Sequence, residues 1–292
     1  MADGVAAAAG YDRGMSLALP DHEAIAAEAL AAIDNARQIA PFSARYPGLT
    51  LDDAYRISDR LCALRTARGE RVIGRKIGFT NRTIWAEYAV SAPIWGFVFD
   101  ATVSGLAPPR QAAQQPFALA PFAEPRIEPE IVFRLAAAPS PDMDEAALFD
   151  CIDWVAQGFE IVQSVFPDWK FTPADTVIVN ALHGALLLAP VHPAGFGKAT
   201  DWVSNLAGFE IDLLRDGEVV DRGHAANVLD GPLSALRHLV GLLASDPVNS
   251  PLTIGDIVTT GTLTRAFSIM PGESWSTRLH GIELGGRPVW FA

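Results

Sequence analysis

Hydrophobic residues recur at helical spacing in the first part of the chain. The alanine-rich segment 21–39 favours a helix by propensity, with Asp21 as its N-cap and Pro41 as a stop. A second helix is expected after Thr50, which can cap it together with Asp53 at the third helical position. Its apolar stripe is formed by Ala54, Ile57, Leu61 and Leu64. This pattern predicts an N-terminal helical layer.

The pattern changes after Gly69 to short runs rich in β-branched and aromatic residues, separated by Gly and Pro. The predicted strands are 71–79, 94–99, 127–135, 159–165 and 185–188. One predicted helix, over 144–156, interrupts them. Further on, Asp216-Gly217 is typical of a hairpin turn between strands over 209–214 and 218–221.

The C-terminal part combines one more amphipathic helix with a final strand. Asp230 can cap this helix, and Pro232 suits its first turn. Its buried stripe consists of Leu233, Leu236, Val240 and Leu243. Gly285-Gly286 is expected to form a hairpin turn that leads into a strand over 289–291.

The same pattern divides the chain into three parts. We expect a flexible tail over residues 1–20, a helical region over 21–69 and a β-rich domain over 70–292. The segment 107–125, rich in Pro, Ala and Gln, is long and irregular, which indicates a surface excursion or a lid. Helices followed by many strands predict the α+β class.

Composition narrows the function classes. Of the 292 residues 50% are hydrophobic, which provides enough material for a packed core. The net charge of −12 argues against nucleic acid, because phosphate binding needs clustered Lys and Arg, whereas a small anionic ligand stays compatible. Cys62 and Cys151 show no ligand spacing, so we expect a reducing, cytoplasmic setting. Every apolar run is shorter than the roughly 20 residues of a membrane helix, so no membrane span is expected.

Two acidic residues share one predicted strand, in Arg126-Ile-Glu-Pro-Glu130. In an extended strand Glu128 and Glu130 project to the same face, where they repel each other unless a cation lies between them. Hard divalent cations prefer such oxygen ligands. The alternative is a solvated strand face. Glu160 lies in another strongly apolar strand, where a buried carboxylate needs a partner, and a shared metal would satisfy all three.

Several short motifs occur in a specific order from about Leu51 to the C-terminus. They are Leu51-Asp-Asp-Ala-Tyr55, Gly74-Arg-Lys-Ile-Gly-Phe-Thr80, Glu128-Pro-Glu130, Phe159-Glu-Ile-Val162, Asp168-Trp-Lys170, Asn180-Ala181 and Gly261-Thr-Leu-Thr-Arg265. In these motifs the sequence resembles the 2-keto-4-pentenoate hydratase and 4-oxalocrotonate decarboxylase family, within the fumarylacetoacetate hydrolase superfamily.

The resemblance implies a mixed β-roll with peripheral helices, assembled as a homo-oligomer. It also implies Mg²⁺ or Mn²⁺ held by Glu128, Glu130 and Glu160, and a small 2-oxo acid as substrate. The expected activity is that of a lyase in aromatic-compound catabolism, either a hydratase or a decarboxylase, which acts through a metal-stabilised enolate.

The resemblance assigns further residues to the site. Lys76 would bind substrate anion or assist proton transfer, with its pKa lowered by burial. Lys170 would close the site from a loop or, alternatively, form a surface ion pair with Asp168. Substrate contacts are also expected from Thr262, Thr264 and Arg265, although a structural ion pair is an equal alternative for the arginine.

Two departures from the family pattern bear on the reaction. Where hydratases commonly have serines, this chain has Leu182 and His183, which weakens the case for hydration. His183 would then serve as a general acid or base, or else be a core histidine bonded to a backbone carbonyl. Where the family often has P-D-F-G, Ile94-Trp95 adds an apolar wall, so Trp95 is expected to contact the substrate.

The sequence is also compatible with two other functions. One is hydrolysis of a C–C bond in an acylpyruvate, as elsewhere in the superfamily. The other is a non-catalytic 2-oxo acid-binding subunit that associates with a pathway enzyme. The chain has no G-x-S-x-G, H-E-x-x-H, P-loop or G-x-G-x-x-G motif, so the serine hydrolase, zincin, kinase and dehydrogenase classes lose support.

Overall fold

The computed structural model describes residues 21–292 apart from 83–84, 89, 106–114 and 196–198, so the expected tail lies outside the described residues. The strands of the large sheet are β1 (Val72–Gly78), β2 (Ile94–Phe99), β3 (Val103–Gly105), β4 (Arg126–Leu135), β5 (Ile152–Val162), β6 (His183–Leu188), β7 (His192–Pro193), β10 (Ile257–Thr259) and β11 (Phe267–Ser268). Their order is β2-β1-β10-β4-β5-β6-β3, with β11 paired to β4 and β7 paired to β5.

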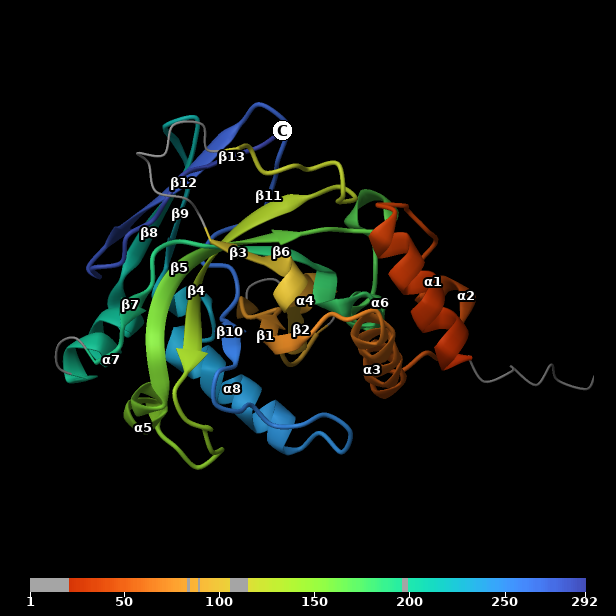
Figure 1. The fold of residues 1–292 in the computed structure, drawn as a ribbon, viewed down its shortest axis with the longest axis horizontal. Helices are drawn as coiled ribbons and strands as arrows, with labels where there is room; N and C mark the ends of the chain where they lie inside the picture. Colours follow the sequence, from red (N-terminus) through yellow and green to blue (C-terminus); the bar gives the residue numbers. More distant parts are fainter. Residues whose placement is uncertain (1–20, 83–84, 89, 106–114, 196–198) are drawn as a thin grey trace, which may run out of the picture.

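A smaller sheet lies against one end of the large one (Figure 1). It has the order β13-β12-β8-β9 and consists of β8 (Glu210–Arg215), β9 (Glu218–His224), β12 (Ser274–His280) and β13 (Val289–Trp290). In the large sheet β1 runs parallel to β10, whereas β4 and β5 are antiparallel. The predicted α+β class with a mixed sheet is therefore confirmed.

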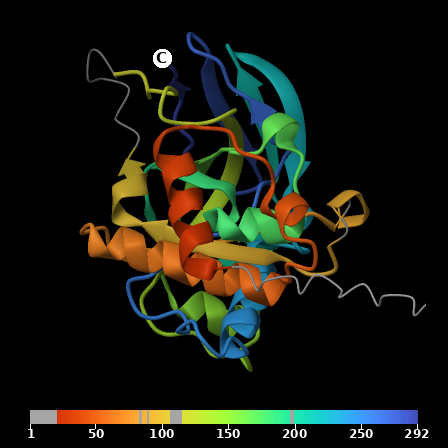
Figure 2. The ribbon, with the colours of Figure 1, turned by 90° about the vertical axis from the view of Figure 1, so that its right-hand side faces the viewer.

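Helices cover both outer sides of the large sheet. They are α1 (His22–Asp34), α2 (Phe42–Arg45), α3 (Leu51–Ala67), α4 (Trp85–Tyr88), α5 (Glu145–Asp150), α6 (Pro173–Ile178), α7 (Ala199–Gly208) and α8 (Pro232–Ala244). The N-terminal helices pack with α6 around a shared apolar cluster and form the expected helical layer, which faces the viewer in Figure 2. On the other side α5, α7 and α8 enclose the largest cluster of buried residues. Within the described residues no helix is both long and apolar enough to cross a membrane.

The two N-terminal caps are where the sequence places them. Asp21 accepts hydrogen bonds from the first turn of α1, and Thr50 and Asp53 form a capping box at the start of α3. The predicted helix over 21–39 is too long, however, because Ala36 adopts a left-handed conformation (φ 47°) just after α1 ends at Asp34. The chain then crosses over, and the amide of Ile39 donates to Val165 O at 2.7 Å.

The predicted helix over 144–156 is correct only in its first half. Asp144 caps α5, but this helix ends at Asp150 and β5 begins at Ile152. Residues Val155 and Ala156 pair with β4 and are buried, so strand pairing overrides the helical propensity of this stretch.

The structure confirms one of the two hairpin turns predicted in the C-terminal part. Asp216 and Gly217 both have positive φ and join β8 to β9, as expected. The cap of α8 is Gly231 rather than Asp230, whose carboxylate instead accepts from Arg82 Nη1 at 2.6 Å. The expected tight turn at Gly285-Gly286 is wrong, because β12 and β13 are joined by the irregular stretch 281–288.

Only part of the predicted excursion over 107–125 is described. Residues 115–125 are irregular, as expected, but they do not stand free of the surface. Phe117 forms a bridge with Phe291, and Leu119 and Ala123 are buried. The described part of this segment therefore packs against the C-terminal strand, and a lid is not evident in it.

The buried carboxylate of Asp175 connects α6 to α2. It accepts hydrogen bonds from the amide (2.8 Å) and hydroxyl (2.6 Å) of Ser43, and also from the amide and hydroxyl of Thr172, both at 2.8 Å. This cap resembles the box formed by Asp53 in α3, except that it is fully buried.

We expect Asp175→Ala to lower the free energy of unfolding by about 3 kcal/mol, because it leaves buried donors unsatisfied. Asp53→Ala, which removes a more exposed capping box, should cost only about 1 kcal/mol. Urea unfolding of both variants measures the difference. Equal losses would show that the Ser43 contacts add nothing to the cap.

Candidate metal centre and active site

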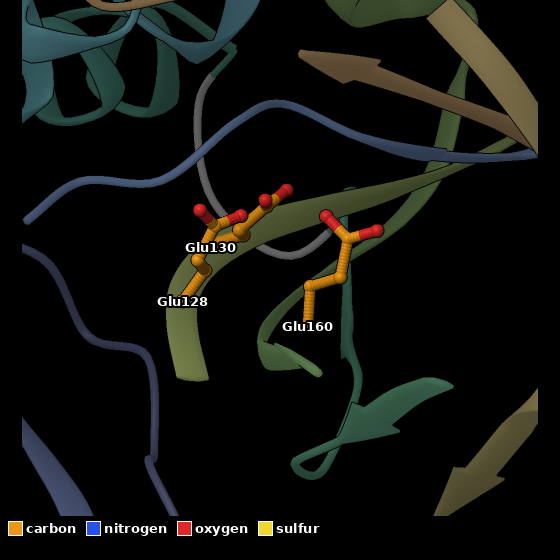
Figure 3. A group of neighbouring side chains, drawn as sticks. All are labelled: Glu128, Glu130 and Glu160. Carbon is orange, nitrogen blue, oxygen red and sulfur yellow. The ribbon is translucent and has the colours of Figure 1, made fainter. Parts of the chain in front are cut away.

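Strand pairing brings the three predicted metal ligands together. Glu128 in β4 lies directly opposite Glu160 in β5, and Glu130 follows two residues later on the same face of β4. One oxygen from each carboxylate lies within 4.8 Å of the others, and the side chains converge in Figure 3. The sheet register, rather than a loop, thus defines the carboxylate cluster.

Two members of this cluster are completely buried. Glu130 and Glu160 have 0% exposure. The amide of Gly261 donates to Glu130 Oε2 at 2.8 Å, whereas Glu130 Oε1 has no hydrogen-bond partner within the described part of the chain. Burial raises the pKa of Glu128 to about 7, and burial together with the charge of Glu160 raises that of Glu130 well above its ordinary value. Such a set of oxygens fits a divalent cation, which would let all three ionise.

Lys76 approaches the cluster from β1. Its Nζ forms an ion pair with Glu160 Oε2 at 3.0 Å and donates to Ala181 O at 3.1 Å. Burial alone would lower the pKa of Lys76, but the charge of Glu160 and of the other two carboxylates raises it above its ordinary value. This direction is opposite to the expected one. Lys76 is therefore held as an ammonium ion beside the carboxylates.

Glu160 stays ionised in this environment. Burial alone would raise its pKa, but the ammonium of Lys76 and a hydrogen bond from His183 lower it to about 2. Lys76 and Glu160 thus form a buried pair of opposite charges in the protein without a metal ion.

A strained turn directs the carbonyl of Ala181 to Lys76. Asn180, Ala181 and Leu182 all have left-handed φ between 52° and 63°, which is costly for residues other than glycine. The side chain of Asn180 secures the turn, because it bonds to both the amide (2.7 Å) and the carbonyl (2.9 Å) of Phe97. A Cβ at Gly96 would come within 2.7 Å of Asn180 O, so only glycine allows this approach.

His183 lies behind Glu160 rather than in front of it. Its Nδ1–H donates to Glu160 Oε1 at 2.7 Å, and its Nε2 lies 2.9 Å from Thr102 Oγ1. The side chain has 0% exposure and is not part of the pocket lining. Direct acid or base catalysis on a substrate, the role expected from sequence, is therefore not what this position offers. The position of His183 agrees better with the alternative, a core histidine. Its Nδ1 partner, however, is the carboxylate of Glu160 and not a backbone carbonyl.

A cavity of about 360 Å³ opens onto this cluster. Its polar lining includes Lys76, Glu128, Arg126, Thr262, Thr264 and Arg265. Its apolar lining includes Phe79, Ile94, Val162, Trp169, Phe171 and Leu182. Another cavity of about 360 Å³, between the α2 region and the start of α6, has no charged residue in its lining. The first cavity is therefore the candidate active site.

Two residues expected to contact the substrate lie outside the lining of this cavity. Trp95 points to the other face of β2, where it stacks on Tyr55 with a ring separation of 5.0 Å, and its neighbour Ile94 faces the cavity instead. Lys170 is exposed and forms the alternative surface ion pair with Asp168 at 3.4 Å. Strand alternation explains the position of Trp95.

The C-terminal residues do reach the cavity. Thr262, Thr264 and Arg265 line it, but each already has a protein partner. The hydroxyl of Thr262 donates to Thr264 O, that of Thr264 donates to Arg265 O, and Arg265 pairs with Asp221 at 3.1 Å. The structural ion pair considered for Arg265 is therefore present.

Arg126 is a pocket residue that the sequence reasoning missed. It lies two positions before Glu128 and so shares its face of β4, and strand alternation alone could have identified it. Its guanidinium carbon lies 4.0 Å from the ring centre of Trp169, which is held by a hydrogen bond from its Nε1 to Glu124 O. The cavity thus has a stacked cation near its carboxylates.

The sequence is similar to those of known hydratases and decarboxylases. The chain is 30% identical to 2-hydroxyhexa-2,4-dienoate hydratase of Comamonas testosteroni over 86% of its length and 90% of that protein. It is also 30% identical to a 4-oxalocrotonate decarboxylase of a Pseudomonas species, over 78% and 85% of the two chains. No family model matches the sequence.

Solved structures agree with the sequence relatives. 4-Oxalocrotonate decarboxylase from Pseudomonas putida G7, complexed with magnesium and adipate, superimposes with a TM-score of 0.80 at 26% identity, covering 93% of this chain and 97% of that one. Fumarylpyruvate hydrolase from Pseudomonas aeruginosa, at 15% identity and a TM-score of 0.53, shares the fold alone.

The fold and the relatives define a lyase-type enzyme with the fumarylacetoacetate hydrolase fold. More closely, the chain belongs to the family of 2-keto-4-pentenoate hydratase and 4-oxalocrotonate decarboxylase.

We expect Lys76→Met to lower the free energy of unfolding in EDTA by about 3 kcal/mol, because it leaves the buried Glu160 without its cation. Arg134→Met, which breaks a half-exposed ion pair with Asp153 between β4 and β5, should cost less than about 1 kcal/mol. Urea unfolding tests both variants. A loss as small for Lys76→Met as for the control would contradict a charged pair in the core.

Proposed function

We propose that the protein is a divalent-metal-dependent lyase that acts on a small 2-oxo acid. The observation that carries this proposal is the buried cluster of three carboxylates beside Lys76, with one oxygen of Glu130 left without a hydrogen bond within the described residues. Glu128, Glu130 and Glu160 would hold Mg²⁺ or Mn²⁺. A cation bound there supplies Lewis-acid polarisation of the 2-oxo group.

Lys76 is suited to orient the substrate and to transfer a proton. An ammonium group has three N–H donors, of which one donates to Ala181 O, while Glu160 Oε2 is its ion-pair partner at 3.0 Å. A further donor can serve the ligand, since Lys76 lines the cavity. Its raised pKa keeps Lys76 protonated at neutral pH, and a cation bound among the carboxylates would lower that pKa and make the proton easier to transfer. Both decarboxylation and hydration of a dienoic acid require a proton at a substrate carbon.

The rest of the cavity favours decarboxylation of a diacid. Arg126 offers a guanidinium two residues, or roughly 7 Å along the strand, from Glu128, where it can bind a second carboxylate. Leu182 replaces a serine of the family pattern and adds an apolar wall, which favours exclusion of water. Hydration is the second candidate, because one relative at 30% identity is a hydratase. Either reaction would belong to aromatic-compound catabolism.

The central experiment compares three substrate classes by ultraviolet absorbance with Mg²⁺ and with EDTA. We expect turnover of 4-oxalocrotonate, or of 2-hydroxypenta-2,4-dienoate, which EDTA abolishes. Glu130→Gln should lower activity at least about 100-fold, because it removes a metal ligand. Glu218→Gln, at an exposed position in β9, is the matched control. Turnover of only an acylpyruvate, or full activity in EDTA, would contradict the proposal.

Arg126→Met should separate diacid from monoacid substrates. Loss of one charge-assisted carboxylate contact, worth about 1.5–3 kcal/mol, should raise KM for 4-oxalocrotonate about 10- to 100-fold. KM for the monoacid dienoate should change little. Arg265→Met is the control, because it removes another arginine from the cavity lining at a position outside β4. An equal effect of Arg126→Met on both substrates would exclude a contact with the second carboxylate.

A further inference from the structure

A chain of side chains continues from Glu160 away from the cavity. Glu160 Oε1 contacts His183 Nδ1 at 2.7 Å, and His183 Nε2 contacts Thr102 Oγ1 at 2.9 Å. Thr102 Oγ1 also lies 2.9 Å from Phe99 O, at the end of β2, and its single proton serves either that carbonyl or His183 Nε2. The carboxylate is thus connected to the backbone of a different strand through two side chains.

Both oxygens of Glu160 are engaged from opposite directions. Lys76 attracts Oε2 at 3.0 Å, and His183 holds Oε1. A glutamate has three rotatable side-chain bonds, so a single contact would leave its carboxylate free to turn. With two contacts the plane of the carboxylate is defined before any ligand binds. Ordering of this kind raises the affinity of a carboxylate for a metal.

The histidine ring is itself fixed in two ways. The strained turn Asn180–Leu182 leads directly into His183, and the side chain is completely enclosed. An imidazole bridges Glu160 and Thr102 because it has a nitrogen on each side of the ring. A serine hydroxyl in its place would be too short to contact both.

We propose that His183 and Thr102 are positioning residues that hold Glu160 in the orientation required by the metal. This inference rests on the proposed metal site and goes beyond it, because neither residue contacts the substrate cavity. It assigns to His183 a role that acts through Glu160. Thr102 has the same positioning role, and no sequence motif indicates it.

The test measures the affinity of the full chain for Mn²⁺, from the electron paramagnetic resonance of the free ion. The melting temperature in EDTA is measured for the same variants. His183→Leu should weaken Mn²⁺ binding about 10- to 100-fold, and Thr102→Val about 10-fold. Asn presents an amide N–H near the place of Nδ1, so His183→Asn should recover most of the affinity. Thr102→Ser, which keeps the hydroxyl, should bind as the wild type does.

A matched control separates positioning from a general loss of stability. Leu236→Ala in α8 removes a fully buried side chain from a part of the core that does not include Glu160, His183 or Thr102. It should lower the melting temperature in EDTA without changing Mn²⁺ affinity. If His183→Leu does not fold, Thr102→Val still tests the inference, because valine has the size of threonine and lacks only its hydroxyl.

Two results would overturn the inference in distinguishable ways. Wild-type affinity in both His183→Leu and Thr102→Val would exclude positioning and leave the metal site intact. Absence of Mn²⁺ binding by the wild type would exclude the metal site itself, and the positioning role with it.

Discussion

The antiparallel pairing of β4 with β5 is the constraint on which the site depends. It sets Glu128 opposite Glu160 and brings Glu130 to the same face, so three carboxylates lie close together and two of them are fully buried. Ionised groups in such a place repel one another strongly. The surrounding residues therefore have to supply positive charge or hydrogen-bond donors. Lys76, the amide of Gly261 and His183 do so, each from a different segment of the chain.

Close backbone approaches make these contacts possible. The strained turn at Asn180–Leu182 brings Ala181 O to Lys76, and it lies so near β2 that Gly96 has no room for a side chain. Gly261 has a similar role, because its φ of 94° and the nearby Thr80 exclude other residues. Strain in such turns persists only where other interactions over-determine the conformation. Here the two hydrogen bonds of Asn180 to Phe97 have that effect.

The cavity combines this charged end with a wall of aromatic and aliphatic side chains. Arg126 and Trp169 stack at 4.0 Å, and Leu182 adds an apolar side chain to the lining. The proposed substrate, a small 2-oxo acid with an acidic head and an unsaturated body, would fit such a cavity.

The sequence by itself determined the features that depend on local spacing. These include the caps at Asp21 and Thr50, the Asp216-Gly217 turn, and the common face of Glu128 and Glu130, because each follows from residues a few positions apart. The strongly apolar strand around Glu160 indicated that its carboxylate joins this pair, whereas Lys76 was connected with the site only through the family resemblance. Tertiary structure decided the rest. The face of β2 that Trp95 occupies, the early start of β5 and the contact of His183 with Thr102 all depend on which strands pair and in which register. A shift of one residue in a strand reverses every side chain, and no short motif encodes the partner of a strand.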